Sequence, residues 1–194
     1  NSNSGKTFTV TPSSNLSSNT TYKIRITTGV KVSTSNALSS QWTTSNGFTT
    51  QNIGFVVVGR SGTIIRSSDG TSWSPLNSGT SKNLWGITYG NSTLVAVGDS
   101  GTVLTSLEGT LWTSRTSGNP EAFYDVTFGN STFVAVGFEG GIFTSPDGVF
   151  WTSRSSGISR HLWGIIYENG NFVVSGDGNI LTSSDGISWT IRLS

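Results

Sequence analysis

The sequence predicts an all-β protein, a β-propeller-like array of four repeats of about 39 residues with four short strands each. A short apolar run that ends in Gly recurs every 39 residues, beginning at Phe55, Leu94, Phe133 and Phe172. A tryptophan recurs at almost the same spacing, at Trp73, Trp112, Trp151 and Trp189. The runs between turn residues are short, rich in Val, Ile, Thr and aromatic residues, and without helical period, which favours strands.

The second repeat shows the expected order of strands most clearly. Its strands are predicted at residues 84–89, 93–98, 102–106 and 111–115, separated by the breaks GNS, DSG and LEG. The four repeats are expected at about residues 51–82, 83–120, 121–159 and 160–194. Four strands in each unit of this length favour a propeller blade, and a solenoid with shorter coils is the alternative.

The first repeat has only a weak candidate for its first strand. Residues 45–50 either supply that strand or close the segment that comes before the repeats. Without a complete fourth blade the array would keep an exposed edge, which invites pairing with another chain. A compact array is favoured, and an assembly completed by a second chain is the alternative.

A Ser-x-Asp-Gly-x-x-Trp motif joins the third and fourth strands of each repeat. Asp-Gly favours a tight turn with positive φ, and Ser and Asp side chains can accept bonds from backbone N–H groups inside it. The Trp is expected to be largely buried between neighbouring sheets. The motif residues, which include one Glu in place of Asp, are Ser67, Asp69, Trp73, Ser106, Glu108, Trp112, Ser145, Asp147, Trp151, Ser183, Asp185 and Trp189.

This motif resembles the Asp-box of the BNR and sialidase-type β-propellers, and the resemblance covers about residues 51–194. It departs from the Asp-box because Gly follows Asp directly and because one turn carries Glu108. The resemblance implies that the motif is structural and lies on the face away from the ligand.

Residues 1–50 lack the repeat landmarks and resemble the C-terminal half of a bacterial Ig-like β-sandwich domain of the adhesin and surface-layer type. The resemblance rests on the segment from Pro12 to Leu16, the strand YKIRITTGV after Thr21, residues 36–38 and residues 48–50. Since the chain also has no Met and no Cys, we expect a fragment of a secreted bacterial precursor, located outside the cell or on its surface.

The composition and the isolated candidate residues argue against nucleic-acid binding, metal binding and enzymatic catalysis. The formal net charge is +1 and 11% of residues are charged, which disfavours nucleic-acid binding. No apolar run is long enough for a membrane helix, and no metal site or cofactor is expected. His161 is the only histidine. Its repeat equivalents are Asn83 or Glu121, depending on the alignment, and we interpret it as a loop residue in a protein that is not an enzyme.

The sequence therefore predicts a binding or adhesion module that recognises a glycan or a protein at the cell surface. The alternative is a structural subunit of an extracellular fibre, sheath or layer, in which copies of the chain assemble by strand pairing. Loops that differ between repeats, at the end opposite the Asp-Gly turns, are the candidate recognition surface. The candidate residues are Arg60, Lys82, Asp99, Glu121, Phe138, Glu139, Arg160, His161 and Asp177.

Overall fold

The chain divides into two units, Asn1–Asn52 and Ile53–Ser194. The computed structural model describes residues 21–22, 25–26, 42–43, 48–49 and 53–193. In the first unit β1 (Thr21–Tyr22) pairs with β4 (Phe48–Thr49), and β2 (Arg25–Ile26) pairs with β3 (Trp42–Thr43), both antiparallel. Residues 48–49 thus belong with the N-terminal unit rather than with the first repeat. The segment from Pro12 to Leu16 and residues 36–38 lie outside the described residues.

The second unit is a series of antiparallel sheets, each built from strands consecutive in the chain. Sheet 1 contains β5 (Phe55–Val58), β6 (Ile64–Ser67) and β7 (Ser74–Leu76). Sheet 2 contains β8 (Leu84–Gly90), β9 (Thr93–Gly98), β10 (Thr102–Ser106) and β11 (Thr113–Thr116). Sheet 3 contains β12 (Phe123–Gly129), β13 (Thr132–Gly137), β14 (Ile142–Ser145) and β15 (Thr152–Arg154). Sheet 4 contains β16 (Leu162–Glu168), β17 (Asn171–Gly176), β18 (Ile180–Ser183) and β19 (Thr190–Leu193).

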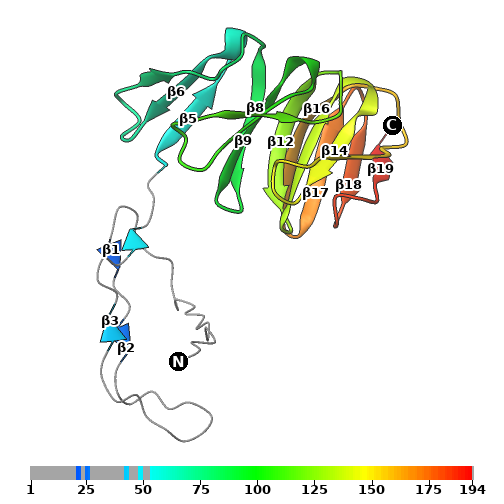
Figure 1. Ribbon diagram of the computed structural model, residues 1–194. Helices are drawn as coiled ribbons and strands as arrows, with labels where there is room; N and C mark the ends of the chain where they lie inside the picture. Colours follow the sequence, from blue (N-terminus) through cyan, green and yellow to red (C-terminus); the bar gives the residue numbers. More distant parts are fainter. Residues whose placement is uncertain (1–20, 23–24, 27–41, 44–47, 50–52, 194) are drawn as a thin grey trace, which may run out of the picture. The chain divides into compact units, whose positions relative to one another are not determined.

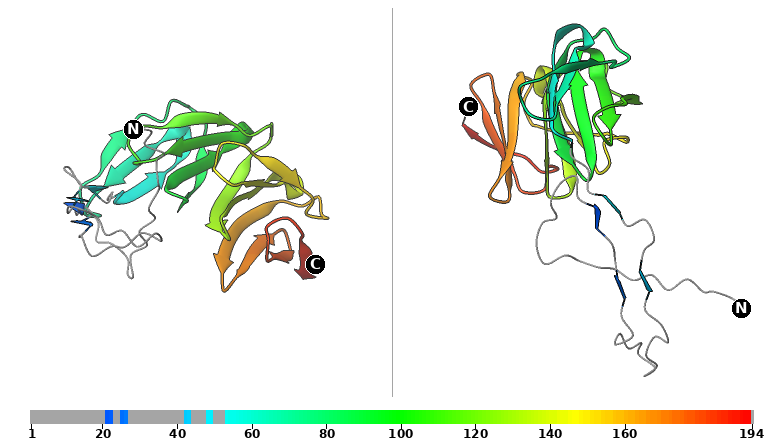
Figure 2. Two further views of the ribbon diagram at one scale, coloured as in Figure 1. Left: turned by 60° about the horizontal axis from the view of Figure 1, so that its bottom comes forward. Right: turned by 90° about the vertical axis from the view of Figure 1, so that its left-hand side faces the viewer.

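These sheets stand side by side along a curved arc (Figures 1 and 2). The prediction of an all-β, propeller-like array of four repeats is confirmed. Sheet 1 has three strands among the described residues, because the segment that would provide its first strand pairs in the N-terminal unit.

The hydrophobic core of the array consists of three layers, one between each pair of neighbouring sheets. We call the face of a sheet toward the preceding sheet its leading face, and the other its trailing face. Between sheets 2 and 3, for example, Val95, Val97 and Val103 of the trailing face pack with Phe123 and Phe133 of the next leading face. Because the strand period of two sends alternate side chains to opposite faces, each interior sheet is apolar on both sides.

A ring-on-glycine contact locks the first strands of neighbouring sheets together. The Phe128 ring of β12 lies directly over Gly90 of β8, and the Tyr167 ring of β16 lies over Gly129 of β12. A Cβ atom at either glycine would collide with the ring. The glycines are therefore seats for an aromatic side chain, a packing role rather than a conformational one.

In the Ser-x-Asp-Gly turns, side-chain oxygens accept hydrogen bonds from backbone N–H groups, as the sequence predicts. In every turn the Ser Oγ accepts from the Gly N–H at 2.8 Å. In three turns the Asp Oδ1 accepts from the N–H groups of the second and third residues after the Asp, and the Trp indole donates to the Gly carbonyl. In the turn that carries Glu108, the buried Nε1 of Trp112 has no partner.

The expectation that all four motif tryptophans are largely buried is wrong for the first one. Trp112, Trp151 and Trp189 are partly buried and pack against the three core layers. Trp73 is 39% exposed, because it lies on the leading face of sheet 1, where no further sheet of the array precedes it.

Candidate recognition surface

Two kinds of loop meet at one end of the sheets. The short 3-10 turns η1 (Arg60–Gly62), η2 (Asp99–Gly101) and η3 (Phe138–Gly140) join β5 to β6, β9 to β10 and β13 to β14. Each of the later turns bonds to the loop that enters its own sheet: Asp99 N–H donates to the Asn83 carbonyl, and Phe138 N–H donates to the Ala122 carbonyl. The Asp-Gly turns lie at the opposite end, where Asn91 and Asn130 side chains reach the turns of the following sheets.

A β-bulge places one aromatic residue at this end of each complete sheet. The pairing register of the first strand skips one residue, between Leu84 and Gly86, Phe123 and Asp125, and Leu162 and Gly164. The skipped residues are Trp85, Tyr124 and Trp163. Since a bulge residue has no partner in the ladder and is turned out of the pleat, Trp85 stays 43% exposed and Trp163 stays 50% exposed.

Carboxylates hold the two exposed indoles in place. Trp85 Nε1 donates to Asp99 Oδ1 at 2.6 Å, and Trp163 Nε1 donates to Asp177 Oδ1 at 2.7 Å. The second oxygen of Asp99 accepts from Asn83 Nδ2 at 2.8 Å. Both large apolar rings are thus fixed at the surface by a hydrogen bond.

Tyr124 lies among these groups. Its ring stacks on the Trp163 indole, with centroids 4.5 Å apart and an interplanar angle of 20°. Burial raises the pKa of the Tyr124 hydroxyl, and the negative charges of Asp99, Asp177 and Glu121 raise it further. The bulge aromatics therefore sit in a negative field. We call Trp85, Tyr124, Phe138, His161 and Trp163 the aromatic rim.

His161 is a packing and hydrogen-bonding residue of this rim. Its Nδ1 accepts from the Glu139 N–H at 3.2 Å, and its ring lies 4.8 Å from Phe138 and 5.3 Å from Trp163. Asn83 Oδ1 accepts in the same way from the Ser61 N–H. The same spacing assigns Ala122 as the third equivalent, so the alignment of His161 with Glu121 is wrong. A side chain that accepts a loop N–H at this position stabilises the loop.

The structure brings together five of the nine residues predicted from sequence, namely Asp99, Phe138, Glu139, His161 and Asp177. Glu121 contributes only its charge. Arg60, Lys82 and Arg160 lie exposed in the same loops. The sequence interpretation missed Trp85, Tyr124 and Trp163. Their signal was present, because an aromatic residue recurs every 39 residues at the second position of each first strand.

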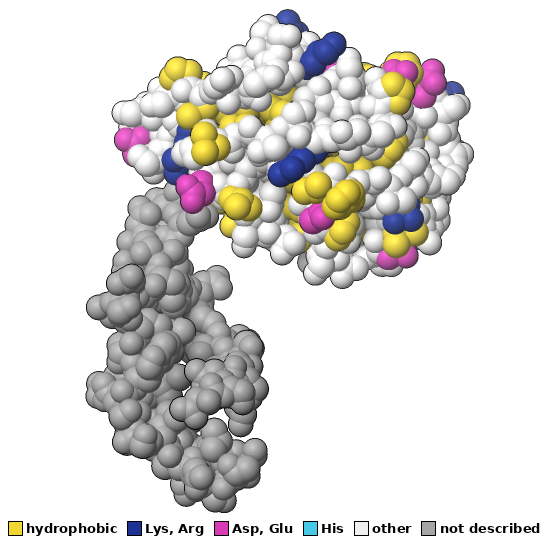
Figure 3. Space-filling model, viewed as in Figure 1, with side chains coloured by type: hydrophobic (Ala, Val, Ile, Leu, Met, Phe, Trp, Pro, Cys, Tyr) yellow, Lys and Arg dark blue, Asp and Glu magenta, His cyan; other side chains and the backbone are white. Residues whose placement is uncertain are grey.

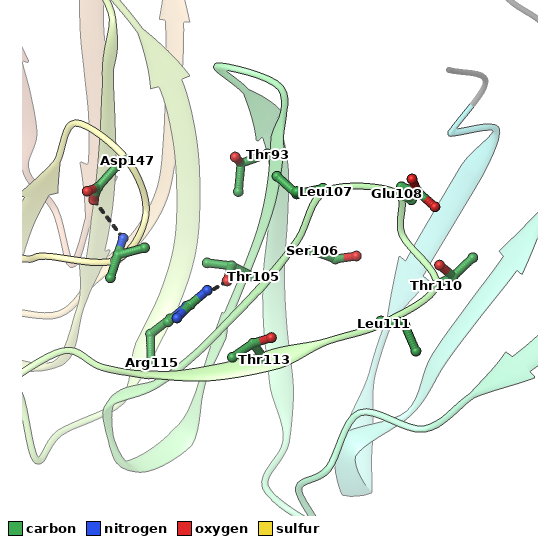
Figure 4. A pocket seen from close by; sticks show the side chains of 11 residues that line it. Thr93, Thr105, Ser106, Leu107, Glu108, Thr110, Leu111, Thr113, Arg115 and Asp147 are labelled. Carbon is green, nitrogen blue, oxygen red and sulfur yellow. Dashed lines mark hydrogen bonds between the residues drawn. The ribbon is translucent and has the colours of Figure 1, made fainter. Parts of the chain in front are cut away.

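A hollow lies at the opposite end, between the Asp-Gly turns of sheets 2 and 3 (Figure 4). It encloses about 470 Å³ and is lined by Leu107, Glu108, Leu111, Arg115 and Asp147 among others. Arg115 Nε donates a hydrogen bond to Thr105 Oγ1, and Asp147 accepts hydrogen bonds from two N–H groups of its own turn. These two charged side chains thus serve the fold, and the aromatic rim with its exposed indoles is the stronger candidate.

On the face of the array seen in Figure 3, hydrophobic side chains reach the surface in several places, with charged side chains scattered among them. Within the described residues no group of three His, Cys, Asp or Glu side chains could hold a metal ion. The described part of the chain also contains no helix of the length and hydrophobicity that a membrane crossing requires.

The comparisons with known proteins cover the two units separately. Solved structures of YCF48 match the array: one described as YCF48 bound to D1 peptide has a TM-score of 0.57 at 18% identity, covering 72% of this chain and 49% of that one. YCF48 from Cyanidioschyzon merolae has a TM-score of 0.55 at 18% identity, with 72% and 52% coverage. The chain thus spans about half the length of these structures. The GH74 enzyme of Niastella koreensis matches with a TM-score of 0.45 at 19% identity, with 71% and 23% coverage.

The N-terminal unit is similar to a known domain family. Residues 1–50 match the family described as bacterial Ig-like domain, a kind of domain typical of surface proteins. A comparison with curated proteins gave no match. The chain thus combines a segment similar to bacterial Ig-like domains with a propeller-like array, and this combination points to a surface or binding module.

Proposed function

We propose that the array is a non-catalytic module that binds a protein partner through the aromatic rim, outside the bacterial cell or on its surface. The observation that carries the proposal is the row of bulge aromatics Trp85, Tyr124 and Trp163. Two of them remain about half exposed, although burial of so large an apolar ring would be favourable. Exposed, rigidly held aromatic side chains are typical anchors of protein recognition.

A peptide segment fits this surface better than a glycan. Tyr124 and Trp163 cover one face of each other, so the charges near the rings decide between the two partner classes. The negative charges of Asp99, Asp177 and Glu121 surround the rings, and aromatic faces beside carboxylates attract Lys or Arg side chains. The YCF48 structure of the same fold is described as bound to a peptide, which supports this partner class.

The absence of catalysis is proposed on similar grounds. His161 is the only histidine. Its Nδ1 accepts from the Glu139 N–H, and its ring packs against Trp163. Asp69 and Asp185 are committed to the N–H groups of their turns, and these bonds lower the pKa of both carboxyls. The Ser-x-Asp-Gly turns therefore act as the structural motif that the Asp-box resemblance implied.

The test is binding of the full chain to an immobilised peptide array and to a glycan array, beside a panel of chromogenic glycosides. Trp85→Ala combined with Trp163→Ala should abolish peptide binding, and Phe138→Ala should weaken it. The matched control is Ser68→Arg with Ser184→Arg at the Asp-Gly end, which should leave binding unchanged. Selective glycan binding would replace the partner class, loss of binding in the control would move the site, and glycoside turnover would contradict a non-catalytic role.

A structural subunit that assembles by strand pairing is the second candidate. One observation favours it: β5 is an edge strand of a three-stranded sheet among the described residues, and an unpaired edge is a template for another strand. Ordered polymers seen by electron microscopy, together with no binding on either array, would favour this candidate over the binding module.

A further inference from the structure

The two ends of the array expose faces that are buried everywhere inside it. On the leading face of sheet 1, Phe55 is 55% exposed, whereas its repeat equivalent Phe133 is fully buried. Val57 and Trp73 are exposed on the same face. On the trailing face of sheet 4, Ile180 is 38% exposed, whereas its equivalent Ile142 is fully buried. Ile166 is exposed beside it.

We propose that these two faces bind each other between two copies of the chain, with sheet 4 of one copy packed on sheet 1 of the next. The interior of the array shows what such faces accept, because each trailing face is covered by a leading face of the same repeat type. An interface of this kind joins two different patches, so copies join head to tail.

Two departures from the repeat pattern, one at each end of the array, make the end faces of sheets 4 and 1 complementary. A first strand carries a ring that needs a glycine seat in the sheet before it, as Phe128 needs Gly90. Sheet 4 has Glu168 at the position of that seat, so it cannot receive a complete sheet with its ring. Sheet 1 has no first strand among the described residues, and therefore brings no ring.

The remaining contacts of an interior interface are available at the two ends. Inside the array, a valine of the second strand packs on the turn glycine of the next sheet, as Val95 does on Gly148 and Val134 does on Gly186. Val173 is the corresponding valine of sheet 4, and Gly70 is the corresponding glycine of sheet 1. Sheet 4 thus keeps the valine that would pack on the turn of sheet 1, and it lacks the glycine that would receive the aromatic ring of a first strand.

The number of copies follows from the length and curvature of the array. The four sheets follow an arc (Figure 2), and the chain covers about half of each YCF48 chain that it matches. Two arrays joined at both ends would close such an arc, and we expect a closed pair.

Analytical ultracentrifugation of the full chain over a range of concentrations tests the inference. The wild-type chain should form a dimer. Val57→Glu on the leading face and Ile180→Glu on the trailing face should each give a monomer, because each variant lacks one of the two faces that a joint needs. Both positions are exposed within one copy, so the fold should persist, which near-UV circular dichroism checks. Leu111→Glu, at an 84% exposed apolar residue on an Asp-Gly turn, is the matched control and should leave the dimer unchanged.

Mixing the two variants distinguishes head-to-tail pairing from symmetric pairing. In the mixture the intact trailing face of V57E meets the intact leading face of I180E, so a one-to-one dimer should reappear, weaker than the wild type because it has one joint instead of two. A wild-type chain that stays monomeric, a single variant that still dimerises, or a mixture that stays monomeric would overturn the inference. Peptide binding is measured separately, so a failure here leaves the proposed function untouched.

Discussion

At the scale of single residues, the repeated turn shows how few groups decide a local structure. One hydroxyl and one carboxylate oxygen satisfy three consecutive N–H donors in the turn from Ser183 to Trp189. These bonds lower the pKa of the Asp185 carboxyl, chiefly through the N–H groups of Ser188 and Ile187. A depressed folded pKa adds stability above the unfolded pKa, and this contribution is lost as the pH falls toward the folded value.

Glu108→Asp should stabilise the protein. Glu108 is one methylene longer than the Asp residues of the other three turns, and Trp112 beside it has a buried indole N–H without a partner. Shortening the side chain restores the arrangement in which Asp binds two N–H groups and the indole reaches a carbonyl. We expect a gain of about 1 kcal/mol, measured by urea unfolding. Asp147→Glu is the reciprocal control and should lose stability, and an unchanged midpoint in both variants would contradict this account.

At the scale of strands, a single carboxyl ties two sheets together. Asp125 occupies the position held by Gly86 in sheet 2 and Gly164 in sheet 4. Its Oδ1 accepts from its neighbour Val126, and its Oδ2 accepts from the Ile165 N–H of the next sheet at 3.0 Å. Burial raises the pKa of this carboxyl despite both bonds, so its charged form is held at a cost that the hydrogen bonds only partly offset.

Asp125→Ala should destabilise the array and change its pH dependence. The variant leaves the Ile165 N–H without its acceptor, which costs about 1–3 kcal/mol. In the wild type the raised pKa means that the folded state binds the proton more tightly than the unfolded state. The Asp125 contribution therefore declines as the pH rises from the unfolded value of 3.8 through the raised folded value. Urea titrations at several pH values should show this slope in the wild type and in Thr127→Ala, and not in D125A.

The strands were predictable from sequence because their signals are local and repeated. The 39-residue spacing placed every sheet of the array, and the Ser-x-Asp-Gly pattern placed the turns. The bulges were not predictable, because the residues LWG are compatible with both a regular strand and a bulge. Without the bulge, Trp85 reads as one more apolar strand residue. The sequence therefore pointed to the loop residues of the site, such as Phe138 and Asp177, and not to its three bulge aromatics.

At the scale of the whole molecule, an open array distributes stability unevenly. In a repeat protein each unit is stabilised mainly by its direct neighbours. Sheets 2 and 3 have neighbours on both faces, whereas sheets 1 and 4 have a neighbour on one face within the array. The same tryptophan of the turn motif therefore has different surroundings in different sheets.

The cost of removing a motif tryptophan should follow its position in the array. Trp151 packs against the layer between sheets 2 and 3 and lies 6.2 Å from Phe123, so Trp151→Ala should cost about 3–5 kcal/mol, as large-to-small changes in a core do. Trp73→Ala should cost clearly less in the monomer, because Trp73 is exposed on the end face. Chemical denaturation of both variants at low protein concentration makes the comparison, and equal losses would mean that the end face is covered.

The β-bulge at Trp85, Tyr124 and Trp163 affects how freely these positions can be substituted during evolution. A residue outside the ladder has no opposite partner whose size must change with it. The bulge position is Trp in sheets 2 and 4 and Tyr in sheet 3, so it already accepts more than one aromatic residue. A library that randomises only these three codons should keep most members folded and, under the proposed function, should change which peptides they bind.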